Sequence, residues 1–140
     1  MLTVETRTVT GRVTAVGSAG PYTLVVDRPR GAGGGGLGFN GGQLLYLAIA
    51  GCVSNDLFRE AQARGIELTS VRVEVQGDFI GDPQVSGPVG YTVEIAGDAT
   101  AEVLAALVRD VDAIAEIPNS LRAGTPVALG EVTVSGRRTE

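Results

Sequence analysis

An apolar stretch near the middle of the chain sets the strictest requirement on its fold. Residues 44–53 are almost wholly apolar, and Gly65 stands just past the end of a helix predicted from about Gly41 to Arg64. The first half of this helix is apolar on every side, which is typical of a buried helix. The stretch is too short for a membrane span, which needs about 20 apolar residues. We therefore expect it to be buried in protein, with a second copy of the chain completing its cover.

Two segments after this helix alternate between apolar and polar residues. Within residues 66–80, valines at every second position would face one way and the polar residues between them the other. This pattern predicts a strand with one wet face, and residues 89–95 repeat it. The turn expected over 81–88 is too short for a helical crossover, so the two strands are predicted to be antiparallel neighbours.

The remaining elements complete an α+β pattern. In chain order, the sequence predicts a bent strand or hairpin over 2–16, a strand over 22–26, the helix over 41–64, strands over 66–80 and 89–95, a helix capped by Thr100 or Asp98 and ended by Pro118, a turn over 119–122, and a strand over 127–134. The order is β-β-α-β-β-α-β in a single domain, residues 1–140. Strand pairs segregated from helices favour an α+β fold over a wound parallel sheet.

Charge and residue types exclude several classes of function. The net charge is −5 and the 11 basic residues are all arginine. An acidic chain without a basic stripe is a poor partner for nucleic acid or an anionic membrane. With no histidine and one cysteine, a Ser-His-Asp triad, the usual zinc sites and an internal disulfide are excluded. We expect no metal and no cofactor, and a cytoplasmic location because the start of the sequence lacks a signal-peptide pattern.

A glycine-rich loop over residues 31–42 precedes the central helix. Gly33, Gly35 and Gly38 fit the G-x-G-x-x-G spacing of a dinucleotide site. A run of glycines matches such spacing by chance, however, and the chain lacks the further β-α-β units of a parallel sheet. We therefore interpret the segment as a flexible loop, whose free N–H groups leave anion binding open.

Cys52 is the one thiol of the chain. Judged by composition alone, a lone buried cysteine is more often a small hydrophobe than a nucleophile. On the predicted helix, Asp56 lies one turn later, and a carboxylate there disfavours a thiolate. Arg59 lies two turns, or roughly 10 Å, along the helix. A reactive Cys52 would therefore need an arginine from elsewhere in the fold.

The segment GGGGLGFNGGQLLYLAIAGCVSNDL resembles the OsmC/Ohr family. Members of that family carry a glycine-rich loop, a helix start similar to Asn-Pro-x-Glu-Leu, and a cysteine that ends a run of small residues. The matching residues are Asn40, Leu44, Ala48, Ala50, Gly51 and Cys52. Residues 119–127, NSLRAGTPV, look like the family's second site. The predicted order of strands and helices also agrees with the family along nearly the whole chain.

The resemblance implies an OsmC-like intertwined homodimer, with antiparallel sheets around long central helices. It also implies a thiol peroxidase that acts on organic hydroperoxides in oxidative stress defence. Cys52 falls on the family's peroxidatic cysteine, and Arg12 falls on its catalytic arginine. The glutamate that orients this arginine is missing, because Gly42 takes its place, and Ala115 stands where the second, resolving cysteine would be. Gln43 is the polar residue next to the missing glutamate.

Three hypotheses for the function remain open. The first is a one-cysteine peroxidase, in which Cys52 attacks a hydroperoxide, Arg12 stabilises the thiolate and the leaving alkoxide, and an external thiol regenerates the cysteine. The candidate binding residues are Asn40, Gln43 and Asn119. The second is a non-enzymatic protein of the same fold that binds a small hydrophobic ligand in an apolar pocket enclosed by the dimer interface. The residues of that pocket would be Leu45, Ile49, Cys52 and Phe58. The third is a structural or interaction module in which Cys52 is inert.

Overall fold

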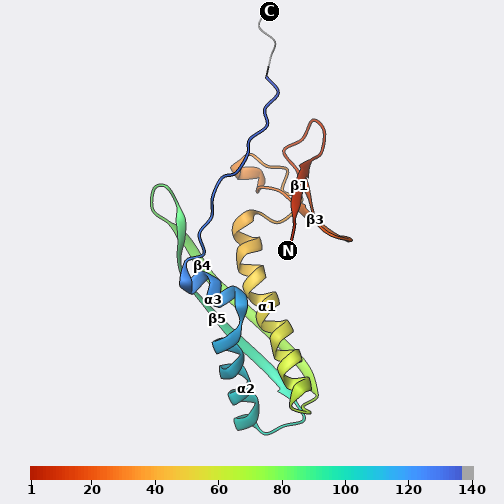
Figure 1. Cartoon of the computed structure of the whole chain (residues 1–140), viewed down its shortest axis with the longest axis vertical. Helices are drawn as coiled ribbons and strands as arrows, with labels where there is room; N and C mark the ends of the chain where they lie inside the picture. Colours follow the sequence, from red (N-terminus) through yellow and green to blue (C-terminus); the bar gives the residue numbers. More distant parts are fainter. Residues whose placement is uncertain (137–140) are drawn as a thin grey trace, which may run out of the picture.

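The computed structural model describes residues 1–136. A small N-terminal sheet, a long helix, a long β-hairpin and two shorter helices form an α+β fold, as predicted (Figure 1). In chain order the elements are β1 (Glu5–Thr8), β2 (Ala15–Ala19), β3 (Tyr22–Val26), the 3₁₀ turn η1 (Arg30–Ala32), α1 (Gly41–Ala63), β4 (Leu68–Ile80), β5 (Val85–Gly97), α2 (Ala101–Ile114) and α3 (Glu116–Ala123). The strands β1, β2 and β3 form one antiparallel sheet, and β4 and β5 form another.

The helix α1 covers nearly the residues predicted, because both of its ends carry local signals. Asn40 caps the first turn together with Gln43, and Gly65 follows the last turn with a φ of +68°, which glycine adopts without strain. Within one chain only one side of α1 is covered: Ile49 is 3% exposed, whereas Leu47 is 50% exposed. Among residues 1–136, no helix has the length and apolar character needed to cross a bilayer.

The strands β4 and β5 are antiparallel, as predicted, and burial alternates along β5 but only over a short part of β4. Arg72 lies opposite Glu94 and donates a hydrogen bond to it at 2.7 Å on the wet face. The connecting turn is shorter than the predicted 81–88, because β5 already begins at Val85 and includes Pro88. Proline has no backbone donor, but each strand of a two-stranded sheet has a free edge, where proline is tolerated.

The core lies where α1 and α2 pack against the β4–β5 hairpin. Its buried members are Val53, Leu57, Ala61, Leu107, Val111 and Ala115. The helix α2 begins after Thr100, whose side chain accepts a hydrogen bond from the Val103 N–H. Of the two caps that the sequence offered, Thr100 is therefore the one used.

Two predictions for the C-terminal part are wrong. The helix α2 ends at Ile114, and Pro118 lies in the first turn of α3, so residues 119–122 are helical. Proline fits there because the N–H groups of a first turn have no partner within the helix. The strand predicted over 127–134 is also absent, since residues 125–136 form no helix or strand (Figure 1). An alternating segment becomes a strand only where a neighbouring strand supplies hydrogen bonds, so the order along the described chain is β-β-β-α-β-β-α-α.

Candidate functional site around Cys52

Cys52 lies in the middle of α1 with its side chain half-buried. It is a free thiol and packs against the buried core cluster without belonging to it. Its neighbour Gly51 faces open space, where an added Cβ would meet nothing within 4 Å. The helix therefore places the Cys52 sulfur between the core and the surface.

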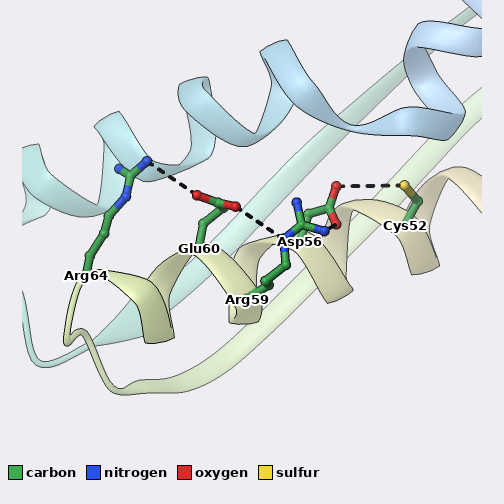
Figure 2. Close-up of polar contacts among 5 residues, drawn as sticks. All are labelled: Cys52, Asp56, Arg59, Glu60 and Arg64. Atoms are coloured by element: carbon green, nitrogen blue, oxygen red, sulfur yellow. Dashed lines mark hydrogen bonds and ion pairs between the residues drawn. The ribbon is translucent and has the colours of Figure 1, made fainter.

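The polar neighbour of the sulfur is Asp56, one helical turn later (Figure 2). Cys52 Sγ lies 4.0 Å from Asp56 Oδ2, and Asp56 is only 6% exposed. The other carboxylate oxygen, Asp56 Oδ1, accepts a hydrogen bond from Arg59 Nη1 at 2.7 Å. The sequence analysis identified Asp56 as a neighbour of the thiol but did not predict its ion pair with Arg59. Opposite charges three residues apart on a helix are the sequence signal for such a pair.

The ion pairs continue along α1 to Arg64 (Figure 2), and Arg64 also reaches α2. Arg59 Nε donates a hydrogen bond to Glu60 Oε1 at 3.2 Å. This hydrogen bond raises the pKa of Arg59 against the effect of burial, and the charge of Asp56 adds to the rise. Arg64 lies 3.9 Å from Glu60 and 2.9 Å from Asp110 of α2. The guanidinium groups of this network are thus held by carboxylates and not by the sulfur.

Arg12 lies away from Cys52 within one chain. Its N–H donates to the carbonyl oxygen of Val9 at 3.0 Å in the turn between β1 and β2, and its side chain is exposed. The N-terminal sheet lies next to the first turn of α1 (Figure 1). Cys52 is about twelve residues, or roughly 18 Å, along the helix from its Asn40 cap. Among residues 1–136, the fold therefore does not bring these two predicted catalytic residues together.

Asn40 and Gln43, predicted as binding residues, use their side chains to cap α1. Each side chain accepts a hydrogen bond at 2.9 Å from the backbone N–H of the other residue. Between them, a Cβ at Gly42 would lie 2.7 Å from Phe79 Cε2. The Phe79 ring is itself stacked on Tyr46, with 5.8 Å between ring centroids. A side chain at position 42 would therefore have to displace this ring.

Asn119 belongs to a second polar cluster, built from β5, α2 and α3. Its Nδ2 donates to the carbonyl oxygen of Ala113 and its Oδ1 accepts from Arg122, both at 2.9 Å. Arg122 also donates to Asp112 Oδ1 at 2.6 Å, and the Tyr91 hydroxyl donates to the same oxygen. Burial, together with Asp112, raises the pKa of Tyr91 to about 12. The hydrogen bonds from Tyr91 and Arg122 hold the pKa of Asp112 below its ordinary value.

The glycine-rich loop encloses a carboxylate of the chain itself. Asp27 is 3% exposed and accepts hydrogen bonds from the N–H groups of Gly35 and Leu37, at 3.1 and 3.2 Å, and from the Thr14 hydroxyl at 2.9 Å. Burial acts to raise the pKa of Asp27, but the hydrogen bonds hold it below its ordinary value. A Cβ at Gly34 would lie 2.0 Å from a backbone oxygen. The loop is thus closely packed around Asp27, not flexible as predicted, and the antiparallel sheets agree with our rejection of a dinucleotide site.

Within one chain, the residues predicted to line an apolar pocket at the dimer interface do not all face the same cavity. Ile49 is buried and lines a cleft toward β5. Phe58 is half-exposed and lines a separate hollow beside Gly65. A ligand in one of these cavities would therefore contact only part of the predicted set.

Comparisons with known proteins agree with this architecture. The sequence profile described as "OsmC-like protein" matches residues 33–130, whereas no curated protein sequence matches the chain significantly. The fold is similar to an OsmC-like protein from Mycoplasma pneumoniae, with a TM-score of 0.76, 15% identity and 89% of each chain covered. It is also similar to an organic hydroperoxide resistance protein, OsmC, from Legionella pneumophila (TM-score 0.64, 20% identity, 87% of this chain and 89% of that chain covered). A third similar structure is the organic hydroperoxide resistance protein OhrB of Bacillus subtilis, with a TM-score of 0.59, 20% identity, and 89% of this chain and 92% of that chain covered. Since the family profile spans most of the sequence and these structures share its fold, the chain belongs to the OsmC-like family.

Proposed function

We propose that the chain works as a homodimer in which Cys52 reduces organic hydroperoxides, with an external thiol as the reductant. The observation that carries the proposal is the place of Cys52, a free, half-buried thiol in the middle of the long helix of an OsmC-like fold. The carboxylate beside it is already paired with Arg59 at 2.7 Å, which reduces its opposition to a thiolate. Two structurally similar proteins are named for organic hydroperoxide resistance.

In the proposed cycle, the Cys52 thiolate attacks the hydroxyl-bearing oxygen of the hydroperoxide. An S–O bond forms, the O–O bond breaks, and the alkoxide leaves and takes up a proton to become the alcohol. Cys52 is thereby oxidised to a sulfenic acid. Ala115 stands where a resolving cysteine would be and is fully buried, so an external thiol attacks the sulfenic acid and releases water. A second external thiol then frees Cys52 and leaves as the disulfide.

The guanidinium that this chemistry needs has to come from a second copy of the chain. Within one chain, Asp56 is the polar neighbour of the sulfur and Arg59 is held by Asp56 and Glu60. Arg12 is exposed at a turn of the N-terminal sheet, where it is free to cross an interface. Placed beside Cys52 of the other subunit, Arg12 would stabilise the thiolate and the charge that develops on the leaving oxygen.

Uncovered apolar surface supports the homodimer. On α1, Leu47 and Phe58 are 50% and 49% exposed, and in the C-terminal segment Val127 and Leu129 are 96% and 89% exposed. Large exposed apolar patches mark protein interfaces, so these side chains are the candidates for contact with a second copy. A second copy that covers α1 and pairs with the backbone of residues 125–136 would remove this surface from water. Analytical ultracentrifugation at micromolar concentration should give twice the mass of the chain, and a monomer would contradict this part of the proposal.

Stopped-flow mixing with cumene hydroperoxide tests the chemistry. We expect the free thiol to be lost in step with peroxide, and Cys52→Ser to remove the reaction. Arg12→Gln should slow the reaction by about 100-fold or more, the order expected for loss of one oxyanion donor. Arg7→Gln is the matched control, since Arg7 is an exposed arginine of the same sheet that pairs with Glu5; it should leave the rate unchanged. Equal rates for the wild type and Cys52→Ser would end the proposal.

A further inference from the structure

A cleft of about 930 Å³ lies between β5 and the helices α2 and α3. Its walls are mainly apolar, with Val89 and Val93 from β5, Val108 from α2 and Leu121 from α3. The helix α1 contributes Ile49, one turn before Cys52. Ligand sites are commonly clefts of about 300–1,000 Å³ with apolar walls and a few fixed polar groups. The size and lining of this cleft therefore suit a small organic molecule.

The polar groups of the cleft leave one positive charge unbalanced. Asp112 accepts hydrogen bonds from the Tyr91 hydroxyl and from Arg122, so its negative charge is already balanced by the Arg122 guanidinium. Arg109 also lines the cleft. The arginines of α1, β4 and α3, and the arginine just after α1, all pair with carboxylates: Arg59, Arg72, Arg122 and Arg64. Among residues 1–136, Arg109 has no such ion pair, although the chain as a whole carries a net charge of −5.

We infer that this cleft binds a monoanionic amphipathic molecule, such as a medium-chain carboxylic acid. The carboxylate would pair with the planar guanidinium of Arg109, which matches it with two parallel hydrogen bonds. The hydrocarbon chain would lie along the valines of β5 and Leu121. The Tyr91–Asp112–Arg122 cluster would fix the polar end of the cleft. This inference goes beyond the proposed peroxidase, because binding in the cleft requires no reaction at Cys52.

A second copy of the chain is the rival occupant of the cleft. The apolar surface that we assign to a second copy includes Leu47, which lies two residues before Ile49 and so about 200° around the helix from it. Leu47 is 50% exposed, whereas Ile49 is 3% exposed and lines the cleft. A second copy that covers Leu47 therefore does not by itself fill the cleft, although the partner's Arg12, proposed beside Cys52, would come within about one helical turn of Ile49.

Isothermal titration calorimetry of the full chain with octanoate, butyrate and 1-octanol tests the inference. We expect octanoate to bind once per chain, butyrate to bind much more weakly because it lacks most of the hydrocarbon, and 1-octanol to bind at least about tenfold more weakly because it lacks the charge. Arg109→Gln should bring octanoate down to the affinity of 1-octanol. Arg7→Gln, which changes an arginine of the N-terminal sheet, is the matched control and should bind octanoate as the wild type does.

Three results would overturn the inference. They are no binding of octanoate, equal binding of octanoate and 1-octanol, and unchanged octanoate binding by Arg109→Gln. If octanoate fails to bind and Arg109→Gln also changes the mass in solution, the cleft is an interface with a second copy. Cys52→Ser should bind octanoate with the affinity of the wild type. The proposal of ligand binding in the cleft and the proposal of peroxide reduction at Cys52 can therefore be refuted independently. The comparison of ligands needs no variant and stands even if Arg109→Gln folds poorly.

Discussion

Replacing Asn40 by alanine tests whether this residue serves the helix or a ligand. Its side chain accepts a hydrogen bond from the Gln43 N–H at 2.9 Å, and the Gln43 side chain accepts one from the Asn40 N–H, also at 2.9 Å. The substitution removes the acceptor of the Gln43 N–H, whereas the backbone N–H of residue 40 can still donate to the Gln43 side chain. Loss of such a cap costs about 1 kcal/mol of the free energy of unfolding. For a domain of this length the melting temperature should fall by about 3–5 °C.

Two further variants separate the cap from other effects at the same place. Asn40→Asp keeps an acceptor and adds negative charge at a helix N-terminus, so its stability should stay within about 0.5 kcal/mol of the wild type or exceed it. Gln43→Ala removes the returning bond only and should cost less than Asn40→Ala. The double variant should lose less than the sum of the two single losses, because the two side chains act as a pair.

Urea unfolding followed by far-ultraviolet circular dichroism measures these differences. The protein concentration must be the same throughout, because the proposed association of the chain would contribute to its apparent stability. The peroxide reaction and octanoate binding are measured in parallel. We expect Asn40→Ala to lose stability and to keep both activities per folded chain. Wild-type stability combined with a lost activity would refute the capping role and return Asn40 to the list of binding residues.

Three other perturbations follow from the structure. Asp56→Asn removes the negative charge 4.0 Å from the sulfur, a charge that disfavours the thiolate. Alkylation of Cys52 by iodoacetamide at neutral pH should therefore become several-fold faster. An unchanged rate would mean that Arg59 already cancels the charge of Asp56. The pKa of Asp27 is lowered in the folded chain. The stability that Asp27 contributes is therefore present above its unfolded pKa of about 3.9 and is lost as the pH falls through the lower, folded pKa. Asp27→Asn should consequently shrink the difference between the urea midpoints at pH 7 and pH 3. Gly42→Glu should cost about 1–3 kcal/mol by crowding the ring of Phe79, and adding Phe79→Ala should recover part of that loss; additive effects of the two changes in melting experiments would count against the steric account.

The elements that the sequence predicts best are those whose signals are local. The bounds of α1 follow from Asn40 at one end and Gly65 at the other, each within a few residues of the helix. The β4–β5 pair follows from alternation and from a short connection. The predicted strand over 127–134 fails for the opposite reason. Whether an alternating segment pairs depends on a strand elsewhere, which local sequence does not describe.

The same distinction holds for the candidate site. Cys52 and Asp56 are neighbours because four residues make about one helical turn, and this was predictable. The position of Arg12 depends on how the N-terminal sheet packs against α1. Its separation from Cys52 within one chain could therefore not be predicted from the sequence. The cluster of Tyr91, Asp112 and Arg122 joins three consecutive elements through hydrogen bonds between residues 21 and 10 positions apart. Helical and strand periodicity do not predict contacts of that spacing, which depend on how the elements pack.

The burial of Asp27 under the glycine-rich loop has a consequence for any free anion. A carboxylate attached to the same chain is present at a high effective concentration, of millimolar order or above for a short connection. Phosphate or a nucleotide arriving from solution would have to displace this resident group from the N–H donors of Gly35 and Leu37. It would also meet the negative charge of the displaced side chain. The loop is thus closed to exogenous phosphates by an intramolecular competitor, even though its spacing of glycines imitates a nucleotide site.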